Sequence, residues 1–176
     1  MAKKKKAAPE GNGASDKKAV GAAESPDAQN AQFGILAQFI KDLSFESPSA
    51  PASLQAPGEN PKLQVNVQVR AIKHADEIYE VDLIFESKAQ SDSGVIYNIE
   101  LIYGGMFQAA NIPEEYIKQV LHVDAPMIML PFLRRVVADL TRDGGFQPLM
   151  LDPIDFGGLY QQNIDKAKIH EAQTAS

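Results

Sequence analysis

Side chains that could carry out acid–base or metal chemistry are few and widely spaced in this sequence. The histidines, His74, His122 and His170, do not share the spacing of metal ligands, and the chain has no cysteine. Asp152 and Asp155, in the segment LDPIDF, form the one close carboxylate pair with apolar neighbours. An acid–base dyad needs both groups to converge in a pocket, whereas aspartate beside proline is a common turn former. We therefore expect no catalytic residue, metal or cofactor, and keep a ligand-binding or hydrolytic α+β domain using this pair as the alternative.

The charge distribution restricts the class of partner. Residues 1–30 carry six lysines and four acidic residues, whereas the rest of the 176-residue chain carries 11 basic and 19 acidic residues. An acidic body does not suit nucleic acid, because neutralising phosphates needs a basic face, and it favours a partner with basic character. The longest apolar stretch, 125–133, is far shorter than the roughly 20 residues that span a bilayer. No apolar segment follows the basic start, so we expect a cytoplasmic protein without direct membrane insertion.

Composition divides the chain into three parts. Residues 1–30 are rich in Lys, Ala, Gly and Ser and contain no aromatic residue, so they cannot bury enough apolar surface to offset the entropy lost on ordering. We expect them to be a disordered tail. Residues 31–160 contain the periodic apolar patterns of one domain, and residues 161–176 are polar, which predicts a flexible C-terminal tail with at most one turn of helix.

Four segments read as strands because apolar and polar residues alternate along them. The first is ambiguous, since a helical period also fits, but it runs into a proline-broken extended segment and we favour a strand. The connections between the last three strands are short, which predicts an antiparallel meander. The four segments are 32–46, 62–70, 79–88 and 95–103.

The remaining elements complete a fold class. Residues 47–61 hold four prolines and one glycine, which predicts a long loop that carries the chain from strand one to a non-adjacent position. Helical patterns occupy about 114–121 and 127–143, with Pro131 expected in the first turn of the second helix. We predict an α+β fold: a four-stranded antiparallel sheet with a long crossover after strand one and two helices on one face.

Two surfaces of this fold carry no catalytic signal yet are unusual. One sheet face gathers carboxylates with exposed isoleucines, which is more typical of a docking surface than of a solvated face. Core packing is the default explanation of the run PMIMLPFL, 126–133, but it is apolar on every side, and flexible methionines suit promiscuous binding. The predicted acidic face comprises Asp42, Glu46, Glu80, Asp82, Glu86 and Glu100, with Ile40, Ile84, Ile96 and Ile102.

Several blocks of sequence resemble the SecB protein-export chaperone family. The resemblance runs in order from about Phe33 to Tyr160. It is carried by KDLSFESPSAP (41–51), YEVDL (79–83), ELIYGGMF (100–107), PMIMLPFLRRVV (126–137) and FQPLMLDPIDFGGLY (146–160).

The resemblance implies a non-enzymatic cytosolic homotetramer, a dimer of dimers, that holds unfolded precursor proteins and delivers them to the SecA motor ATPase. It implies that sheets join edge to edge within a dimer and that helices pack between dimers. It places SecA binding on Asp42, Glu46 and Glu100, with Asn98 standing where the family has an apolar residue. Release would not use ATP, because no nucleotide-binding motif occurs. Client segments would lie in grooves between the crossover loop and the longer helix, at Leu54, Met127, Met129, Leu130 and Phe132.

Overall fold

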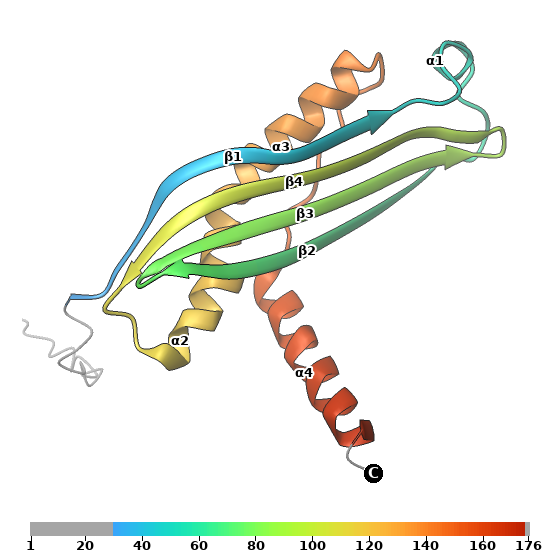
Figure 1. The fold of residues 1–176 in the computed structure, drawn as a ribbon. Coiled ribbons are helices and arrows are strands. Elements are labelled where there is room, and N and C mark those ends of the chain that lie inside the picture. Colours follow the sequence, from blue (N-terminus) through green and yellow to red (C-terminus); the bar gives the residue numbers. More distant parts are fainter. Residues whose placement is uncertain (1–29, 175–176) are drawn as a thin grey trace, which may run out of the picture.

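The computed structural model of the chain describes residues 30–174, and the side chains of residues 30–169. The predicted N-terminal tail therefore lies almost entirely outside the described residues, and so does the side chain of His170. Four long strands form one antiparallel sheet in the order β1-β4-β3-β2, and a helical layer lies across one of its faces (Figure 1). This confirms the predicted fold class. The strands are β1 (Gln32–Glu46), β2 (Lys62–Ala75), β3 (Ile78–Ser91) and β4 (Gly94–Ala110).

The crossover loop, residues 47–61, carries the chain from β1 past β4 and β3 to the far edge of the sheet. It contains one short helix, α1 (Ala52–Gln55), which the sequence did not predict. The hydroxyl groups of Ser47 and Ser49 donate hydrogen bonds of 3.1 Å to the backbone oxygens of Ile96 and Val95 at the start of β4. These bonds hold the loop against the end of the sheet.

The two predicted helices are joined end to end. A π-helical turn, η2 (Val120–Asp124), links α2 (Glu114–Gln119) to α3 (Ala125–Asp143) without a break. Pro126 lies in the first turn of α3, directly after η2, and the helix continues through it. Pro131, expected in a first turn, lies inside α3 instead.

The C-terminal segment is more helical than its composition predicts. Helix α4 (Phe156–Thr174) spans 19 residues where at most one turn was expected. Figure 1 shows it extending away from the body of the fold. Its packing is confined to its first turns, where Phe156 is buried and Leu159 and Tyr160 are half-buried. The rest is polar on most sides, which is why no amphipathic pattern revealed it.

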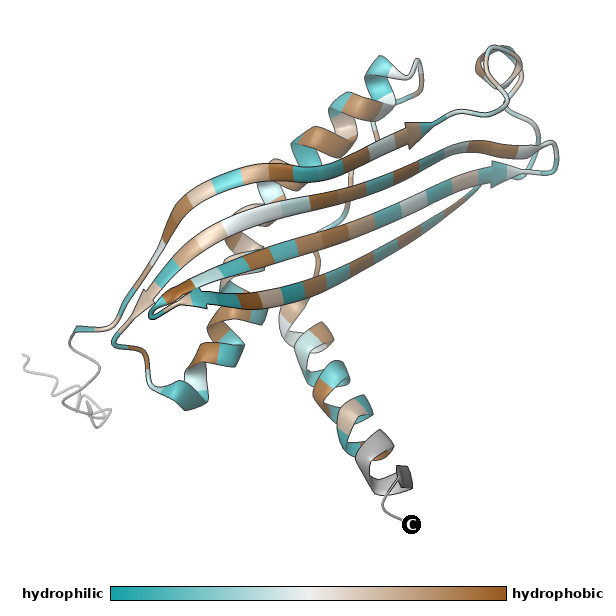
Figure 2. Ribbon diagram, viewed as in Figure 1, coloured by the Kyte–Doolittle hydropathy of each residue, from teal (hydrophilic) through white to brown (hydrophobic). Residues whose placement is uncertain are grey.

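The core lies between the sheet and α3. Figure 2 shows the alternation of hydrophobic and hydrophilic residues along the strands, which leaves one apolar face. That face packs against an apolar stripe of α3, and full burial of a large apolar side chain stabilises the fold by about 1.5–3 kcal/mol. The fully buried side chains at this contact include Val81, Leu83, Phe85, Phe107, Met129, Leu133 and Val137.

Strand β1 contains two bulges, which invert its middle. The register shifts between Ile35 and Ala37 and again between Ile40 and Asp42. Paired residues share a face, so Phe39 opposite Gly104 faces away from the helices, and Ile40 opposite Tyr103 faces toward them. The sequence pattern assigned each of these two residues to the other face. A bulge adds one residue, and each added residue exchanges the faces of those that follow.

Candidate functional site

Four exposed carboxylates lie together on the sheet face that is turned away from the helices. Glu100 on β4 is opposite Ser44 on β1, between Asp42 and Glu46, and is opposite Glu86 on its other side. None of the four lies within 4 Å of a Lys or Arg side-chain nitrogen among the described residues. We call this group the acidic surface: Asp42, Glu46, Glu86 and Glu100. It contains all three residues predicted to bind SecA.

Asp42 is held in place by its own strand. The backbone N–H of Leu43 donates a 3.0 Å hydrogen bond to Asp42 Oδ1. Asn66 Nδ2 donates to Glu86 Oε2 at 3.2 Å, while Asn98, opposite Glu46, is half-buried. Carboxylates on neighbouring strands repel one another when no cation lies between them. Binding of a ligand that brings Lys or Arg side chains is therefore favoured.

Glu80 and Asp82, which the sequence placed on the same exposed face, are buried and already paired. Lys41 Nζ contacts Glu80 Oε1 and lies 3.2 Å from Asp82 Oδ2. Arg70 Nη2 lies 2.6 Å from Asp82 Oδ2, and His74 Nε2 lies 2.6 Å from Glu80 Oε2. These five residues form what we call the ion cluster. Its acids do not belong to the acidic surface, because their charges are neutralised within the chain.

The ion cluster links three strands by crossing a fourth. Asp82 on β3 is opposite Gly104 on β4, which carries no side chain, so Lys41 reaches over β4 from β1. A Cβ at position 104 would lie 2.6 Å from Cε2 of Phe39, which also covers this glycine. The second oxygen of Asp82, Oδ1, is buried and has no hydrogen-bond partner. Two cations on one carboxylate oxygen offset part of its desolvation.

Two further expectations for this face are wrong. Ile96 was expected among its exposed isoleucines, but it is buried in the core. Ile40 is exposed, but it faces the helical side because of the bulges. Ile84 and Ile102 lie opposite one another on the predicted face and are half-buried. The apolar part of the face is therefore smaller than the alternation predicts.

The ion cluster predicts a pH dependence of stability. The hydrogen bond from Lys41, followed by that from His74, holds the pKa of Glu80 below its usual value although burial opposes this. A lowered carboxyl pKa contributes stability that is present above the usual Glu pKa and lost as pH falls through the lowered value. We expect Glu80→Gln to flatten the decline of unfolding free energy in acid, measured by urea titrations at several pH values. The matched control is Glu86→Gln, which is exposed and should leave that slope unchanged; an unchanged slope in both variants would contradict the prediction.

Lys41 gives the pH dependence of stability on the alkaline side. The hydrogen bond with Glu80 is the largest cause that raises the pKa of Lys41 above its usual value. Stability from a raised lysine pKa is present below the usual lysine pKa and is lost as pH rises through the raised value. The contact between Lys41 and Glu80 is therefore most stabilising at pH values between the usual pKa of glutamate and the usual pKa of lysine.

The predicted client-groove residues do not all lie on one surface. Leu54 is exposed and packs beside the turn after α3, where a Cβ at Gly145 would be 3.1 Å from Leu54 Cδ2. Met127, 59% exposed, lies near the other end of α3, and Phe132, 42% exposed, lies near its middle. A helix rises about 1.5 Å per residue, so Met127 and Gly145 are separated by roughly 27 Å.

Met129 and Leu130 are corrected to core residues. Met129 is fully buried, with its sulfur close to the position a Cβ would take at Gly105, and only 9% of Leu130 is exposed. Both lie on the helix stripe that packs against the sheet. A client would reach them only if α3 left the sheet. The sequence could not separate the two faces of the PMIMLPFL run because apolar residues occur on both.

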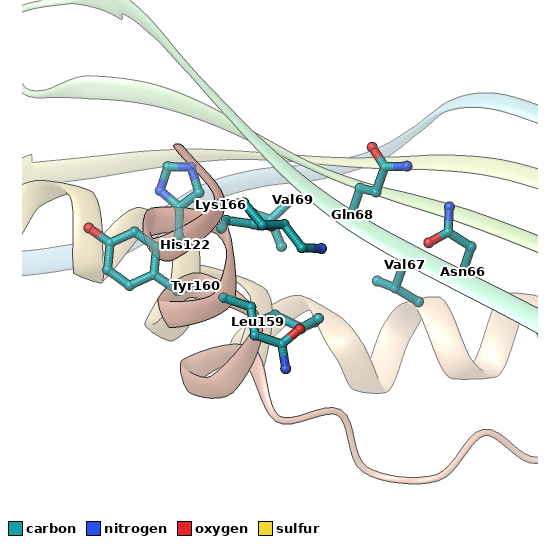
Figure 3. Close-up of a pocket in the computed structure, with 10 residues that line it drawn as sticks. Asn66, Val67, Gln68, Val69, His122, Leu159, Tyr160 and Lys166 are labelled. Carbon is teal, nitrogen blue, oxygen red and sulfur yellow. The ribbon is translucent and has the colours of Figure 1, made fainter. Parts of the chain in front are cut away.

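A trough between β2 and α4 was missed by the sequence analysis. Its lining side chains come from β2, η2 and α4 (Figure 3). The volume of the hollow is about 310 Å³. The rings of His122 and Tyr160 stack at its end, with centroids 5.5 Å apart. β2 is an edge strand, so one side of its backbone is not paired within the sheet. The trough could not be predicted without α4, which forms its wall. Its lining includes Val67, Val69, His122, Leu159, Tyr160 and Lys166.

Asp152 and Asp155, the alternative pair, do not form a dyad. Asp155 directly precedes α4, and its Oδ1 accepts a 2.9 Å hydrogen bond from the backbone N–H of Gly158. This is the geometry of a helix N-cap. Both aspartates are exposed to solvent. Asp155 therefore has a structural role in starting α4.

Two kinds of feature are absent from the part of the chain that the structure describes. No group of three or more His, Asp or Glu side chains between residues 30 and 169 is arranged to hold a metal ion. No helix in the described part of the chain is long and apolar enough to cross a membrane.

Comparisons with known proteins agree with the resemblance in the sequence. The family model described as preprotein translocase subunit SecB matches residues 26–167. The protein-export protein SecB of Bradyrhizobium sp. (strain BTAi1) is 47% identical over 135 residues, 77% of this chain and 83% of that protein. The one from Mesorhizobium japonicum is 44% identical over 159 residues, 89% and 92% of the two chains. The Mycobacterium tuberculosis Rv1957 SecB-like chaperone, solved with a ChAD peptide from the Rv1956 HigA1 antitoxin, shares the fold. Its TM-score is 0.58 at 15% identity, over 73% of this chain and 93% of that one.

Proposed function

Because the chain belongs to the SecB family, whose members are protein-export chaperones and not enzymes, we propose that it binds unfolded precursor proteins in the cytoplasm and delivers them to the SecA motor ATPase. The observation that carries this proposal is the separation of its two candidate surfaces. The acidic surface lies on one face of the sheet, while the exposed apolar side chains of α3 and the trough lie on the other side. A client and a basic partner can then be bound at the same time.

Client capture is passive in this proposal. Unfolded chains expose apolar segments, and covering them is favourable by about 25 cal/mol for each Å² of apolar surface removed from water. The exposed side chains of Leu54, Met127 and Phe132 and the trough along β2 offer such cover. Each contact is weak, so several sites on one assembly must engage the same client, and avidity supplies the affinity. Clients stay unfolded because folding would require leaving these sites.

The exposed apolar edge of the sheet supports assembly into a tetramer. β1 is an edge strand and exposes Ile35, Leu36, Ile40 and Leu43, which is a liability for a monomer and an advantage for edge-to-edge pairing. The outer side of α3 exposes Ile128 next to Phe132 and suits packing between two dimers. We therefore place the dimer contact at β1 and the contact between dimers at α3.

Transfer to SecA uses the acidic surface. The sequence has no nucleotide-binding motif, so client release follows from contact with the partner rather than from ATP binding by this chain. A basic segment of the motor would lie across Asp42, Glu46 and Glu100, where it replaces unpaired carboxylates by ion pairs. This contact leaves the helical side free.

The experiment that tests this function measures mass in solution with and without a denatured, slow-folding client. We expect an assembly of four 19.1 kDa chains that gains the mass of a client when the client is added unfolded. The folded form of the same client is the control and should add no mass. A monomer that ignores unfolded protein would show that the proposal is wrong.

A further inference from the structure

The first bulge in β1 exchanges the faces of the residues after it, and Asp42 and Glu46 face the acidic side because the second bulge reverses that exchange. Between the bulges, Phe39 faces away from the helices and Ile40 faces toward them. A regular strand continued from Ile40 would turn Asp42 and Glu46 toward the helices, because each residue alternates in face. Lys41 is the additional residue, unpaired in the register, that restores the alternation before Asp42.

Lys41 is also the residue of β1 that is fastened to the sheet by charge. It lies 3.2 Å from Asp82 Oδ2 and contacts Glu80, and both acids are buried on β3, two strands away. These contacts fix where the additional residue sits along β1. A second anchor follows it, because the ring of Phe45 stacks on Tyr97 with centroids 6.0 Å apart and lies 6.5 Å from Phe146.

We infer that Lys41 is a positioning residue for partner docking, which fixes the bulge so that Asp42 and Glu46 point to the acidic surface. The inference rests on the proposed function, since it concerns how that surface is built. Lys41 itself does not bind the partner, because its ammonium group is engaged by Glu80 and Asp82. The remaining anchor at Phe45 keeps the strand in the sheet when Lys41 is replaced, so its loss loosens the bulge without unfolding the domain.

The direction of one effect tests this inference. Lys41→Met removes a positive charge close to an acidic surface, and by electrostatics alone it would strengthen the binding of a basic partner. Loosening of the bulge would instead weaken the binding of that partner, because Asp42 and Glu46 would no longer be held on the acidic surface. We expect Lys41→Met to weaken the affinity for purified SecA about tenfold, within the range of coupling between neighbouring residues. Lys41→Arg, which retains the ion pairs, should restore affinity to the level of the unaltered protein.

Lys88 provides a matched control on the same face. It is exposed, lies opposite Asn98, and makes no ion pair with the described residues. Lys88→Met therefore changes only the charge and should leave SecA binding equal or tighter. If Lys41→Met also binds SecA equally or more tightly, the positioning role is wrong.

A double-mutant cycle separates this inference from the proposed function. If Lys41 acts through Asp42, Lys41→Met should have little further effect in a chain that already carries Asp42→Asn. Additive effects of the two changes would overturn the positioning role while leaving the docking surface intact. If Asp42→Asn alone leaves SecA binding unchanged, the proposed docking surface itself is wrong.

A second variant covers the case in which Lys41→Met does not fold. Lys41→Met with Asp82→Val replaces a buried ion pair by apolar groups, an exchange that proteins often tolerate. It leaves the net charge unchanged, so electrostatics predicts no change in docking. We expect the same loss of SecA affinity, with unfolded-client capture retained. Unchanged affinity would overturn the inference.

Discussion

The combined substitutions Asp42→Lys, Glu46→Lys and Glu100→Lys are expected to lower the affinity for SecA by at least roughly 100-fold, or about 2.7 kcal/mol. The three carboxylates are exposed, share one face, and have no cationic partner within 4 Å among the described residues. Reversing their charge replaces attraction of a basic segment by repulsion at three points. The affinity is measured by titrating SecA with the altered and unaltered proteins.

Client capture should be retained in the same variant. The exposed apolar residues Leu54, Met127 and Phe132 and the trough lie on the other side of the sheet. The matched control reverses Glu114, Glu115 and Asp165, three exposed acids on α2 and α4, for the same change in net charge. That control should keep SecA binding. Equal loss of client and SecA binding in the first variant would show that the surface has been misassigned.

Salt gives an independent check on the docking surface. Exposed charges about 8 Å apart are largely screened at physiological ionic strength and more so above it. SecA binding by the unaltered protein should therefore weaken as salt is added, whereas client capture through apolar contacts should not weaken. A salt-independent docking affinity would contradict a carboxylate surface.

Met129→Ala is expected to lower the unfolding free energy by about 2–5 kcal/mol, because it leaves a cavity in the core. Met129 is fully buried between α3 and Gly105, whereas Met127, two residues earlier, is 59% exposed. Met127→Ala is the matched control and should change stability by less than about 0.5 kcal/mol, as surface substitutions generally do. Urea unfolding of both variants measures the difference.

Client capture by the same two variants distinguishes a groove residue from a core residue. Met127→Ala should reduce capture of a denatured client while the fold is unaffected. Met129→Ala should capture clients normally at temperatures where it stays folded. Normal stability in Met129→Ala would show that this methionine is not part of the core, and reduced client capture in that variant would assign it to the groove.

The strands could be predicted because their alternation has a period that no helix shares. β2, with Leu63, Val65, Val67 and Val69 alternating with polar residues, is the clearest case. The bulges of β1 could not be predicted, because an added residue leaves the composition of the strand unchanged. Two bulges cancel, however, so Asp42 and Glu46 kept the face that simple alternation gave them. The face on which these two residues lie was therefore predicted correctly, although the pattern contained neither bulge.

The sequence pattern could not predict which acidic residues of the sheet face are buried and which are exposed. Simple alternation places Glu80 and Asp82 on the same face as Glu86 and Glu100, yet the first two are buried and the others are exposed. Only the first two belong to the ion cluster, in which Arg70 and His74 reach them from β2 and Lys41, distant in sequence, crosses Gly104. Contacts that depend on a bulge in one strand and a missing side chain in another leave no periodic signal. α4 was missed for a related reason, since a helix with few buried residues has little amphipathic pattern.

Gly104 also constrains how this protein can change over evolution. Any side chain at this position would meet the ring of Phe39 and stand in the path of Lys41, so a new residue there is tolerated only after both neighbours have changed. If Lys41 is replaced first, the buried acids Glu80 and Asp82 lose one cation. If Gly104 is replaced first, the new side chain lies between Lys41 and these acids. Each single step is expected to lower stability even where the final combination is stable, because substitutions at contacting residues do not have additive effects. Lineages are therefore expected to inherit positions 39, 41, 80, 82 and 104 as a unit.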